Sequence, residues 1–159
     1  MNLQKVRDVM TKQPITIDPD APLATAAAVM REREIRHLPV IDAAGRLMGI
    51  ITDRDLRSAV FTPLVAEYLP SDERRQLRGV GETLENLRVR DAMTWDTVTT
   101  GPDVSLAQAA AVMFSARVGS LAVVEAGRLM GIITERDVLR ALAMTVPAIR
   151  GADPDTYLW

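Results

Sequence analysis

A seven-residue pattern, Gly-Ile-Ile-Thr-x-Arg-Asp, occurs twice in the chain, and its residue types could do chemistry at the start of a helix. The first copy contains Thr52 and Asp55, and the second contains Thr134 and Asp137. An exposed helix N-terminus has unpaired amides and a partial positive charge that suit a phosphate, and a threonine hydroxyl can add a hydrogen bond. An aspartate three residues later can accept hydrogen bonds from both ribose hydroxyls, and the glycine leaves room for a planar base. The pattern therefore predicts a site that holds a nucleoside phosphate without reacting with it.

The same residues also have a purely structural interpretation. A threonine followed three residues later by an acid resembles a capping box, in which the two side chains satisfy the first amides of the helix. A glycine within a strand can simply mark a bulge. The pattern alone leaves both interpretations open.

The two copies belong to a duplication that covers most of the chain. "VRDVMT" at residues 6–11 matches "VRDAMT" at residues 89–94. "GRLMGIITDRD" at residues 45–55 returns as "GRLMGIITERD" at residues 127–137. When residue 6 is aligned with residue 89, roughly half of the paired positions are identical. The chain is therefore expected to contain two copies of one structural unit.

Each copy predicts the same series of elements. A short strand is followed by an amphipathic helix, two strands that form a hairpin, and a second helix that starts at Thr52 or Thr134. The predicted strands are 15–17, 37–41 and 47–51 in the first copy and 98–100, 120–124 and 129–133 in the second. The apolar stripe of the first helix comprises Leu23, Ala26, Ala27 and Met30, repeated as Leu106, Ala109, Ala110 and Met113. It predicts core packing, with a contact between halves or between chains as the alternative. A unit of about 55 residues buries its apolar faces poorly alone, so the two copies should pack together.

Composition narrows the classes of function. The 19 basic residues are interleaved with 21 acidic ones, and the net charge of −2 argues against a nucleic-acid platform. No apolar run approaches the roughly 18 residues of a membrane span, and no apolar signal core follows the first residues, so we expect a cytoplasmic protein without a membrane segment. Cysteine is absent and His37 is the only histidine, which excludes disulfides, cysteine-bound zinc and a histidine-rich metal site within one chain.

In this order and spacing, "VRDVMT", "HLPVID" and "GRLMGIITDRDL" with their second copies resemble a pair of CBS (cystathionine-β-synthase) domains, also called a Bateman module. The resemblance covers residues 6–60 and 89–142. It implies an α/β (α+β) fold in which two β-α-β-β-α repeats pack with pseudo-two-fold symmetry. We assign repeat 1 to residues 1–60, a partly helical connector to 61–88, repeat 2 to 89–144 and a flexible C-terminal tail to 145–159.

The resemblance also implies two ligand-binding clefts between the repeats. Each cleft would combine strand residues of one repeat with the threonine and aspartate of the other. The first would contain Ile15, Thr16, Ile17, Arg36, His37, Leu38, Pro39, Thr134, Arg136 and Asp137. The second would contain Val98, Thr99, Thr100, Ser120, Leu121, Ala122, Thr52, Arg54 and Asp55. By resemblance, the aspartates bind ribose, the threonines approach the phosphate or ribose, and the strand residues enclose adenine.

The two clefts differ where a phosphate would bind. Arg36 and His37 of the first repeat correspond to Gly119 and Ser120 of the second. Because arginine contacts to phosphate are charge-assisted, a polyphosphate should prefer the first cleft. As an alternative, His37 is a strand-edge histidine bonded to backbone, and Arg36, Arg54 and Arg136 are solvated surface residues.

The resemblance implies a regulatory module that binds an adenine nucleotide, AMP, ADP or ATP, with Mg²⁺ as an accompanying ion, and passes its occupancy to an unidentified partner protein. The alternatives are another adenosyl ligand, S-adenosylmethionine or NAD(H), and a scaffold protein with vestigial clefts. An enzyme is not expected, because the sequence offers no nucleophile with a base. Homodimerisation through the helices is implied by the resemblance.

Overall fold

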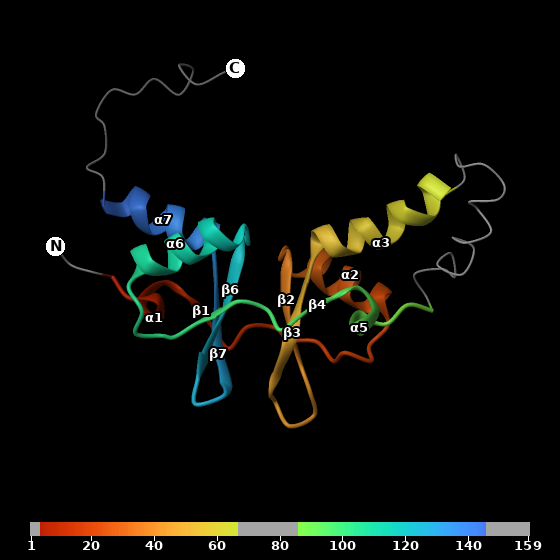
Figure 1. Ribbon diagram of the computed structural model, residues 1–159, viewed down its shortest axis with the longest axis horizontal. Helices are drawn as coiled ribbons and strands as arrows, with labels where there is room; N and C mark the ends of the chain where they lie inside the picture. Colours follow the sequence, from red (N-terminus) through yellow and green to blue (C-terminus); the bar gives the residue numbers. More distant parts are fainter. Residues whose placement is uncertain (1–3, 67–85, 146–159) are drawn as a thin grey trace, which may run out of the picture.

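The computed structural model describes residues 4–66 and 86–145, which form two similar halves side by side (Figure 1). The first repeat comprises α1 (Val6–Val9), β1 (Thr11–Lys12), α2 (Leu23–Glu32), β2 (His37–Ile41), β3 (Leu47–Thr52) and α3 (Asp53–Ala66). The second comprises α5 (Val89–Ala92), β4 (Thr94–Trp95), β5 (Thr99–Thr100), α6 (Leu106–Ala116), β6 (Ser120–Glu125), β7 (Arg128–Thr134) and α7 (Glu135–Thr145). The mixed α/β fold with two repeats is therefore confirmed.

The predicted connector and tail fall largely on residues 67–85 and 146–159, which lie outside the described residues. Helix α3 continues beyond the boundary assigned to repeat 1, as far as Ala66. The proposed boundaries of the connector and the tail stay predictions.

Each half contains a sheet completed by a strand from the other repeat. One sheet has the order β2-β3-β4, and the other has the order β1-β7-β6-β5. Strand β4 follows α5 in repeat 2 but pairs antiparallel with β3 of repeat 1, and β1 of repeat 1 pairs antiparallel with β7 of repeat 2. The opening segments of the two repeats are therefore exchanged, an arrangement that the sequence analysis did not predict.

The first predicted strand of each repeat is shorter than expected. In repeat 2 it is β5, which covers Thr99 and Thr100 and runs parallel to β6. In repeat 1 the equivalent segment makes only an isolated bridge between Ile17 and Val40. Two backbone hydrogen bonds hold this bridge, from Ile17 to Pro39 at 3.0 Å and from Ile41 to Ile17 at 3.1 Å.

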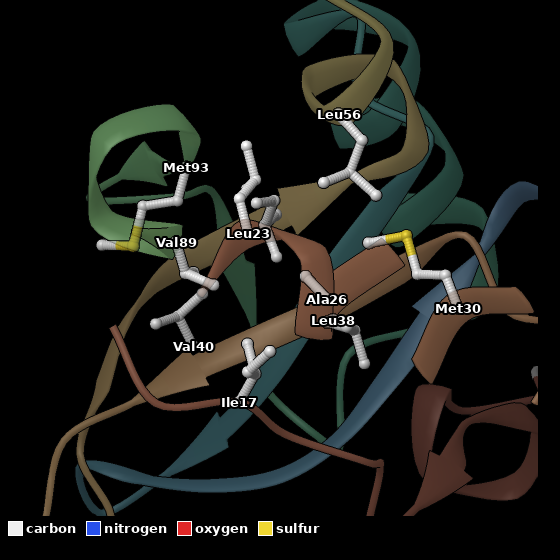
Figure 2. Close-up of a cluster of buried hydrophobic side chains, with 10 residues drawn as sticks. Ile17, Leu23, Ala26, Met30, Leu38, Val40, Leu56, Val89 and Met93 are labelled. Atoms are coloured by element: carbon white, nitrogen blue, oxygen red, sulfur yellow. The ribbon is translucent and has the colours of Figure 1, made fainter. Parts of the chain in front are cut away.

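The exchanged segments also complete the hydrophobic cores. Between its helices and its sheet, the first half buries a cluster that includes Leu23 and Val40 together with Val89 and Met93 of the opening segment of repeat 2 (Figure 2). The core of the second half includes Val6 of repeat 1 in the same way. Val6 and Val89 are both fully buried, so each repeat contributes an apolar side chain to the core of the opposite half.

The apolar stripe of the first helix packs into these cores, with one residue fewer than predicted. Three of each four stripe residues are buried, namely Leu23, Ala26 and Met30 in α2 and Leu106, Ala109 and Met113 in α6. Ala27 is exposed and Ala110 is only half-buried. Core packing, the first interpretation of the stripe, is therefore the main role of these helices.

Matching polar contacts fasten the exchanged segments at the surface. Arg7 forms an ion pair with Asp103, and the equivalent Arg90 forms one with Asp20 at 2.5 Å. A second cation, Lys5, donates to Asp103 at 2.9 Å, and these contacts lower the pKa of the Asp103 carboxyl, chiefly through the hydrogen bond from Lys5. Because all these side chains are well exposed, solvent screens the ion pairs and they stabilise the fold little, so apolar burial holds the segments in place.

Backbone hydrogen bonds repeat the same exchange in each half. The amide of Val6 donates to Val104 at 2.9 Å, and the amide of Val89 donates to Ala21 at 3.0 Å. The opening helices are thereby docked on the loops that precede α6 and α2. This docking positions β1 and β4, the two crossing strands, beside the hairpin of the opposite half.

The glycine of each Gly-Ile-Ile-Thr pattern lies where a crossing strand approaches most closely. A Cβ atom on Gly49 would lie 2.2 Å from the carbonyl oxygen of Thr94. On Gly131 it would lie 2.7 Å from the carbonyl oxygen of Thr11 and 2.7 Å from the sulfur of Met10. The expectation that these glycines leave room for a planar base is wrong, because the backbone of the other repeat fills that space. The alternative of a bulge is confirmed, since the strand register shifts beside both glycines.

The faces of the two hairpins that point away from the helices are also buried. Pro39 and Ile50 in the first half, and Ala122 and Ile132 in the second, are buried but belong to neither helix-covered cluster. Figure 1 shows β2 and β6 next to each other at the middle of the molecule. These four residues are therefore buried on the sheet faces that are turned away from the helices.

We expect Gly49→Ala to lower the free energy of unfolding by about 2–4 kcal/mol, because the new methyl group overlaps a backbone carbonyl that cannot move without displacing β4. Urea denaturation monitored by circular dichroism measures the change. Gly101→Ala is the matched control, since its Cβ would meet only a side-chain methyl at 3.7 Å. Equal stability of the two variants would contradict the proposed role of the crossing strand.

Candidate functional site

The two repeated Thr-x-x-Asp segments form the N-termini of α3 and α7. In each half, the last strand of the hairpin leads directly into the helix, so the threonine caps the helix and the aspartate lies in its first turn. Both helices begin near the middle of the molecule and run outward in opposite directions (Figure 1). Their positive dipole ends are therefore both directed toward the region where the repeats meet.

Each threonine and aspartate are joined by three hydrogen bonds. The Thr52 amide and hydroxyl donate to Oδ2 of Asp55 at 2.8 and 2.7 Å, and the Asp55 amide donates to the hydroxyl oxygen of Thr52 at 3.3 Å. Thr134 and Asp137 repeat this arrangement at 2.9, 2.7 and 3.4 Å. The capping-box interpretation of the pattern is therefore confirmed in both halves.

A capping box leaves part of each carboxylate available. All the hydrogen bonds described for Asp55 and Asp137 use Oδ2, and none of those within the described residues uses Oδ1. Both aspartates are only half-buried. The cap therefore fixes the direction of a carboxylate whose second oxygen can accept hydrogen bonds from a ligand.

Some of the predicted strand residues cannot contact a ligand through their side chains. The side chains of Ile17, Leu38 and Leu121 lie in the helix-covered cores, and Leu38 and Leu121 are fully buried. They point away from the face that joins the repeats, because side chains alternate along a strand. Only the backbone groups of these three residues can take part in a site there.

Pro39 and Ala122 are buried but belong to neither helix-covered core. Ser120 at the start of β6 is also buried, with 5% of its surface exposed, and its partner in the hairpin is Thr134. These residues can form the floor of a site between the repeats.

The remaining strand residues are more accessible. Ile15 and Val98 occupy equivalent positions in the two repeats and expose 40% and 37% of their surfaces. Thr16 and Thr100 are half-buried, and Thr99 is exposed. An apolar side chain at this position in both repeats is compatible with a surface that a planar ring would cover.

The three arginines of the predicted site, Arg36, Arg54 and Arg136, are all exposed. This agrees with the solvated-surface alternative in the structure without a ligand. The backbone of Arg36 has a structural role, because its carbonyl accepts a hydrogen bond from Asp53 at the start of α3 at 3.0 Å. Gly119 accepts the equivalent bond from Glu135 at 3.0 Å.

His37 lies where the two repeats meet. Its Nε2 is 3.5 Å from the position that a Cβ of Gly119 would occupy, and a carboxylate oxygen of Glu135 is 3.7 Å from the same point. A histidine from the first repeat is thus placed beside the start of α7 in the second repeat. The predicted grouping of His37 with the Thr134 pattern stays a prediction. The resemblance did not indicate Glu135, whose only signal in the sequence is its position directly after the threonine.

Opposing effects act on the ionisation of His37. Burial lowers the pKa of its imidazole below the usual 6.5, and the neighbouring Arg36 lowers it further, whereas Glu135, Asp55 and Asp53 act in the opposite direction. Desolvation outweighs the three carboxylates. The free protein therefore holds His37 predominantly neutral at pH 7.

No group of three or more histidine, aspartate and glutamate side chains within residues 4–66 and 86–145 has the geometry to hold a metal ion. Among the same residues, none of the helices combines the length and apolar character needed to cross a membrane.

Comparison with known proteins defines the class. The sequence pattern of the CBS domain matches residues 6–62 and 89–144. The chain therefore belongs to the CBS-domain family, as a tandem pair of these domains.

Relatives resemble this chain over nearly its whole length. A CBS domain-containing protein of Dictyostelium discoideum is 36% identical over 138 residues, which cover 86% of this chain and 90% of that protein. The crystal structure of CBSX2 in complex with AMP superimposes with a TM-score of 0.71 at 26% identity and covers 88% of this chain and 96% of the other. The CBS domain pair of protein MJ0100, in complex with 5′-methylthioadenosine and S-adenosyl-L-methionine, gives a TM-score of 0.68 at 26% identity and covers 87% and 99% of the two chains.

The lowered pKa of His37 predicts a pH dependence of stability. Above about pH 6.5 the imidazole is neutral in both the folded and the unfolded chain and contributes nothing. As the pH falls below that value, the unfolded chain binds a proton that the folded chain does not yet bind, so stability is lost. Wild type should therefore lose more free energy of unfolding than His37→Gln between about pH 7.5 and pH 5.

Chemical denaturation of both proteins across this range measures the difference, in which the titration of the carboxylates largely cancels. A constant difference between wild type and His37→Gln would show that His37 titrates as it does in the unfolded chain.

Proposed function

We propose that this protein is a regulatory module that binds an adenine nucleotide in two clefts between its CBS repeats and transmits occupancy to a partner protein. The observation that carries this proposal is the pair of capped helix N-termini, each with a half-buried aspartate whose Oδ1 is available to a ribose. It is supported by the AMP complex of CBSX2, which has the same fold over 88% of this chain.

In this proposal, each cleft takes its binding groups from both repeats. Thr134, Arg136 and Asp137 would act with backbone groups of 15–17 and 36–39, and Thr52, Arg54 and Asp55 would act with those of 98–100 and 120–122. Ile15 and Val98 would lie against the adenine ring, since they are exposed at equivalent positions. An adenosyl ligand without phosphates, such as S-adenosylmethionine, is the alternative for the cleft that lacks Arg36 and His37, and the MJ0100 complex supports it.

A ligand held between the repeats can act on their relative arrangement. Differential binding to two arrangements shifts the population toward the one that binds more tightly, without any catalysis by this chain. We accordingly propose a non-catalytic, cytoplasmic protein whose partner is another protein. Mg²⁺ would enter only with a polyphosphate ligand.

We expect AMP, ADP or ATP to raise the melting temperature, since a ligand at about 100 times its dissociation constant stabilises the fold by roughly 2.7 kcal/mol. S-adenosylmethionine and NADH test the other adenosyl ligands. Isothermal titration calorimetry should give two sites per chain in wild type. Asp55→Asn and Asp137→Asn should each remove one site, and the double variant should bind neither.

Asp91→Asn is the matched control, because Asp91 also caps a helix, accepting from the Arg88 amide at 2.8 Å, but lies outside both predicted clefts. No thermal shift with any of the five compounds at millimolar concentration would contradict nucleotide binding and favour a scaffold. Retained binding in the double variant would contradict the assigned residues.

We also propose that two chains associate through the outer faces of α6 and α7. Large apolar side chains are exposed there, including Phe114 at 87%, Leu139 at 65% and Met144 at 79%. The positions in repeat 1 that match Phe114 and Leu139 hold Arg31 and Arg57, both exposed. The apolar surface therefore favours contact between the second repeats of two chains.

The double variant Phe114→Glu, Leu139→Glu should be monomeric in sedimentation velocity at about 0.1 mM, while wild type should be dimeric, because charges on a shared apolar face repel across it. Arg31→Glu with Arg57→Glu is the matched control on the first repeat and should leave the dimer intact. A monomeric wild type, or a dimeric Phe114 and Leu139 variant, would contradict this interface.

A further inference from the structure

The duplication makes the region where the repeats meet nearly symmetric, with three differences that concern charge or size. Asp53 at the start of α3 corresponds to Glu135 at the start of α7, and both donate their amides to the residue before the hairpin. Those residues are Arg36 in one repeat and Gly119 in the other, and each is followed by His37 or Ser120. Only one of the two predicted clefts therefore has an imidazole.

His37 of the first repeat lies beside Gly119 of the second. With Nε2 at 3.5 Å from the point where a Cβ would lie, the imidazole is in ordinary van der Waals contact distance of that point. A side chain larger than a methyl group there would compete with the imidazole for space. The glycine on one repeat and the histidine on the other are thus spatially complementary.

The charged groups around His37 come from both repeats. Arg36 precedes it on its own strand, Asp53 and Asp55 lie on α3, and Glu135 lies on α7. Arg36 and burial oppose a proton on the imidazole, and the three carboxylates favour it. Burial and Arg36 together outweigh the three carboxylates, so the pKa of His37 is lowered and the imidazole is predominantly neutral near pH 7.

A phosphate in this cleft would reverse that balance. Its negative charge would add to the three carboxylates and would be shared by Arg36, whose repulsion of an imidazolium would then be compensated. The imidazolium can also donate a hydrogen bond from Nε2 that a neutral imidazole protonated on Nδ1 cannot. Binding of the anion and binding of the proton therefore strengthen each other.

We propose that His37 makes one of the two clefts a proton-coupled site: a nucleotide phosphate bound there brings a proton onto His37, and it is held more tightly as the pH falls. This inference rests on the proposed function, because it concerns the first of the two nucleotide clefts. The second cleft, with Gly119 and Ser120, binds its ligand without a proton. The protein would thus respond jointly to nucleotide concentration and to pH.

Because His37 is the only histidine of the chain, its protonation can be followed directly in the full-length protein. Proton NMR of the single imidazole Hε1 signal gives its pKa with no ligand, with saturating AMP and with saturating adenosine. We expect the value to lie below 6.5 without ligand and to rise by about one pH unit with AMP. Adenosine, which has no phosphate, should leave it within about 0.2 of the free value.

Binding measurements provide the second readout. The affinity ratio of wild type to His37→Gln for AMP should increase about tenfold from pH 8 to pH 5.5, since the titration of AMP itself cancels in the ratio. The ratio for adenosine should stay constant. In the matched variant Arg36→Gly, which copies the residue of the second repeat, the pKa of His37 in the free protein should rise and the AMP-induced change should shrink.

The outcomes separate this inference from the function on which it rests. If calorimetry shows AMP binding but the His37 signal titrates at the same pH with and without it, the proton coupling is wrong and nucleotide binding stands. If adenosine moves the signal as far as AMP does, the phosphate is not the cause and the proposal fails. If neither compound binds, the proposed function fails and the coupling with it.

Discussion

The structure depends on the crossing of two backbone segments between the repeats. Strands β1 and β4 pass onto the hairpin of the opposite half, and this is possible only because Gly49 and Gly131 have no side chain at the crossing. The apolar residues that precede the strands, Val6 and Val89, are then buried in the opposite cores. Neither half has a complete core or a complete sheet by itself, so the two repeats fold as one cooperative unit.

This exchange also fixes where the candidate site lies. Each sheet ends on a strand from the other repeat, which ties the two hairpins together. The sheet faces turned away from the helices bury Pro39, Ile50, Ala122 and Ile132. The helices that follow the hairpins must then begin near the same region. Two dipole ends with positive potential are therefore directed toward the same region by the packing that completes the cores, and an anion bound at each would be stabilised by it.

Sequence periodicity was sufficient to predict the hairpins and the longer helices, but it did not predict that the opening segments of the two repeats are exchanged. The hairpins and the longer helices α2, α3, α6 and α7 depend on residues within a few positions of each other, and they were predicted, as were the caps at Thr52 and Thr134 as one of two interpretations. The short helices α1 and α5 of the opening segments were not predicted. The pairing of β1 with β7 joins residues more than a hundred positions apart, as in Thr11 with Ile132, and no local pattern encodes such a partner. The same reason explains why the glycines were misinterpreted: the atoms that fill the space beside Gly49 belong to Thr94, which the alignment of the repeats had assigned to the other half.

The candidate site was predictable in part, for a related reason. A strand pattern identifies which residues lie near a site but not which face of the strand is covered, so Ile17, Leu38 and Leu121 were included although their side chains belong to the cores. The position of His37 beside Glu135 likewise required the arrangement of both repeats. Which strand face is covered and which residue lies beside His37 both depend on tertiary packing, so they could not be predicted from local sequence patterns.

Differences between the two repeats carry more information about function than their similarities. The retained features, such as the capping boxes, the glycines and the Arg7 and Arg90 ion pairs, are each explained by folding alone. A cap at Thr52 would be needed with or without a ligand, so its repetition cannot separate a binding module from a scaffold. Folding gives no reason, however, for Arg36 and His37 to face Gly119 and Ser120, since both pairs fit the same backbone geometry. Arg36 is exposed, and charging the half-buried imidazole of His37 costs desolvation. An anionic ligand that binds on that side would offset this cost.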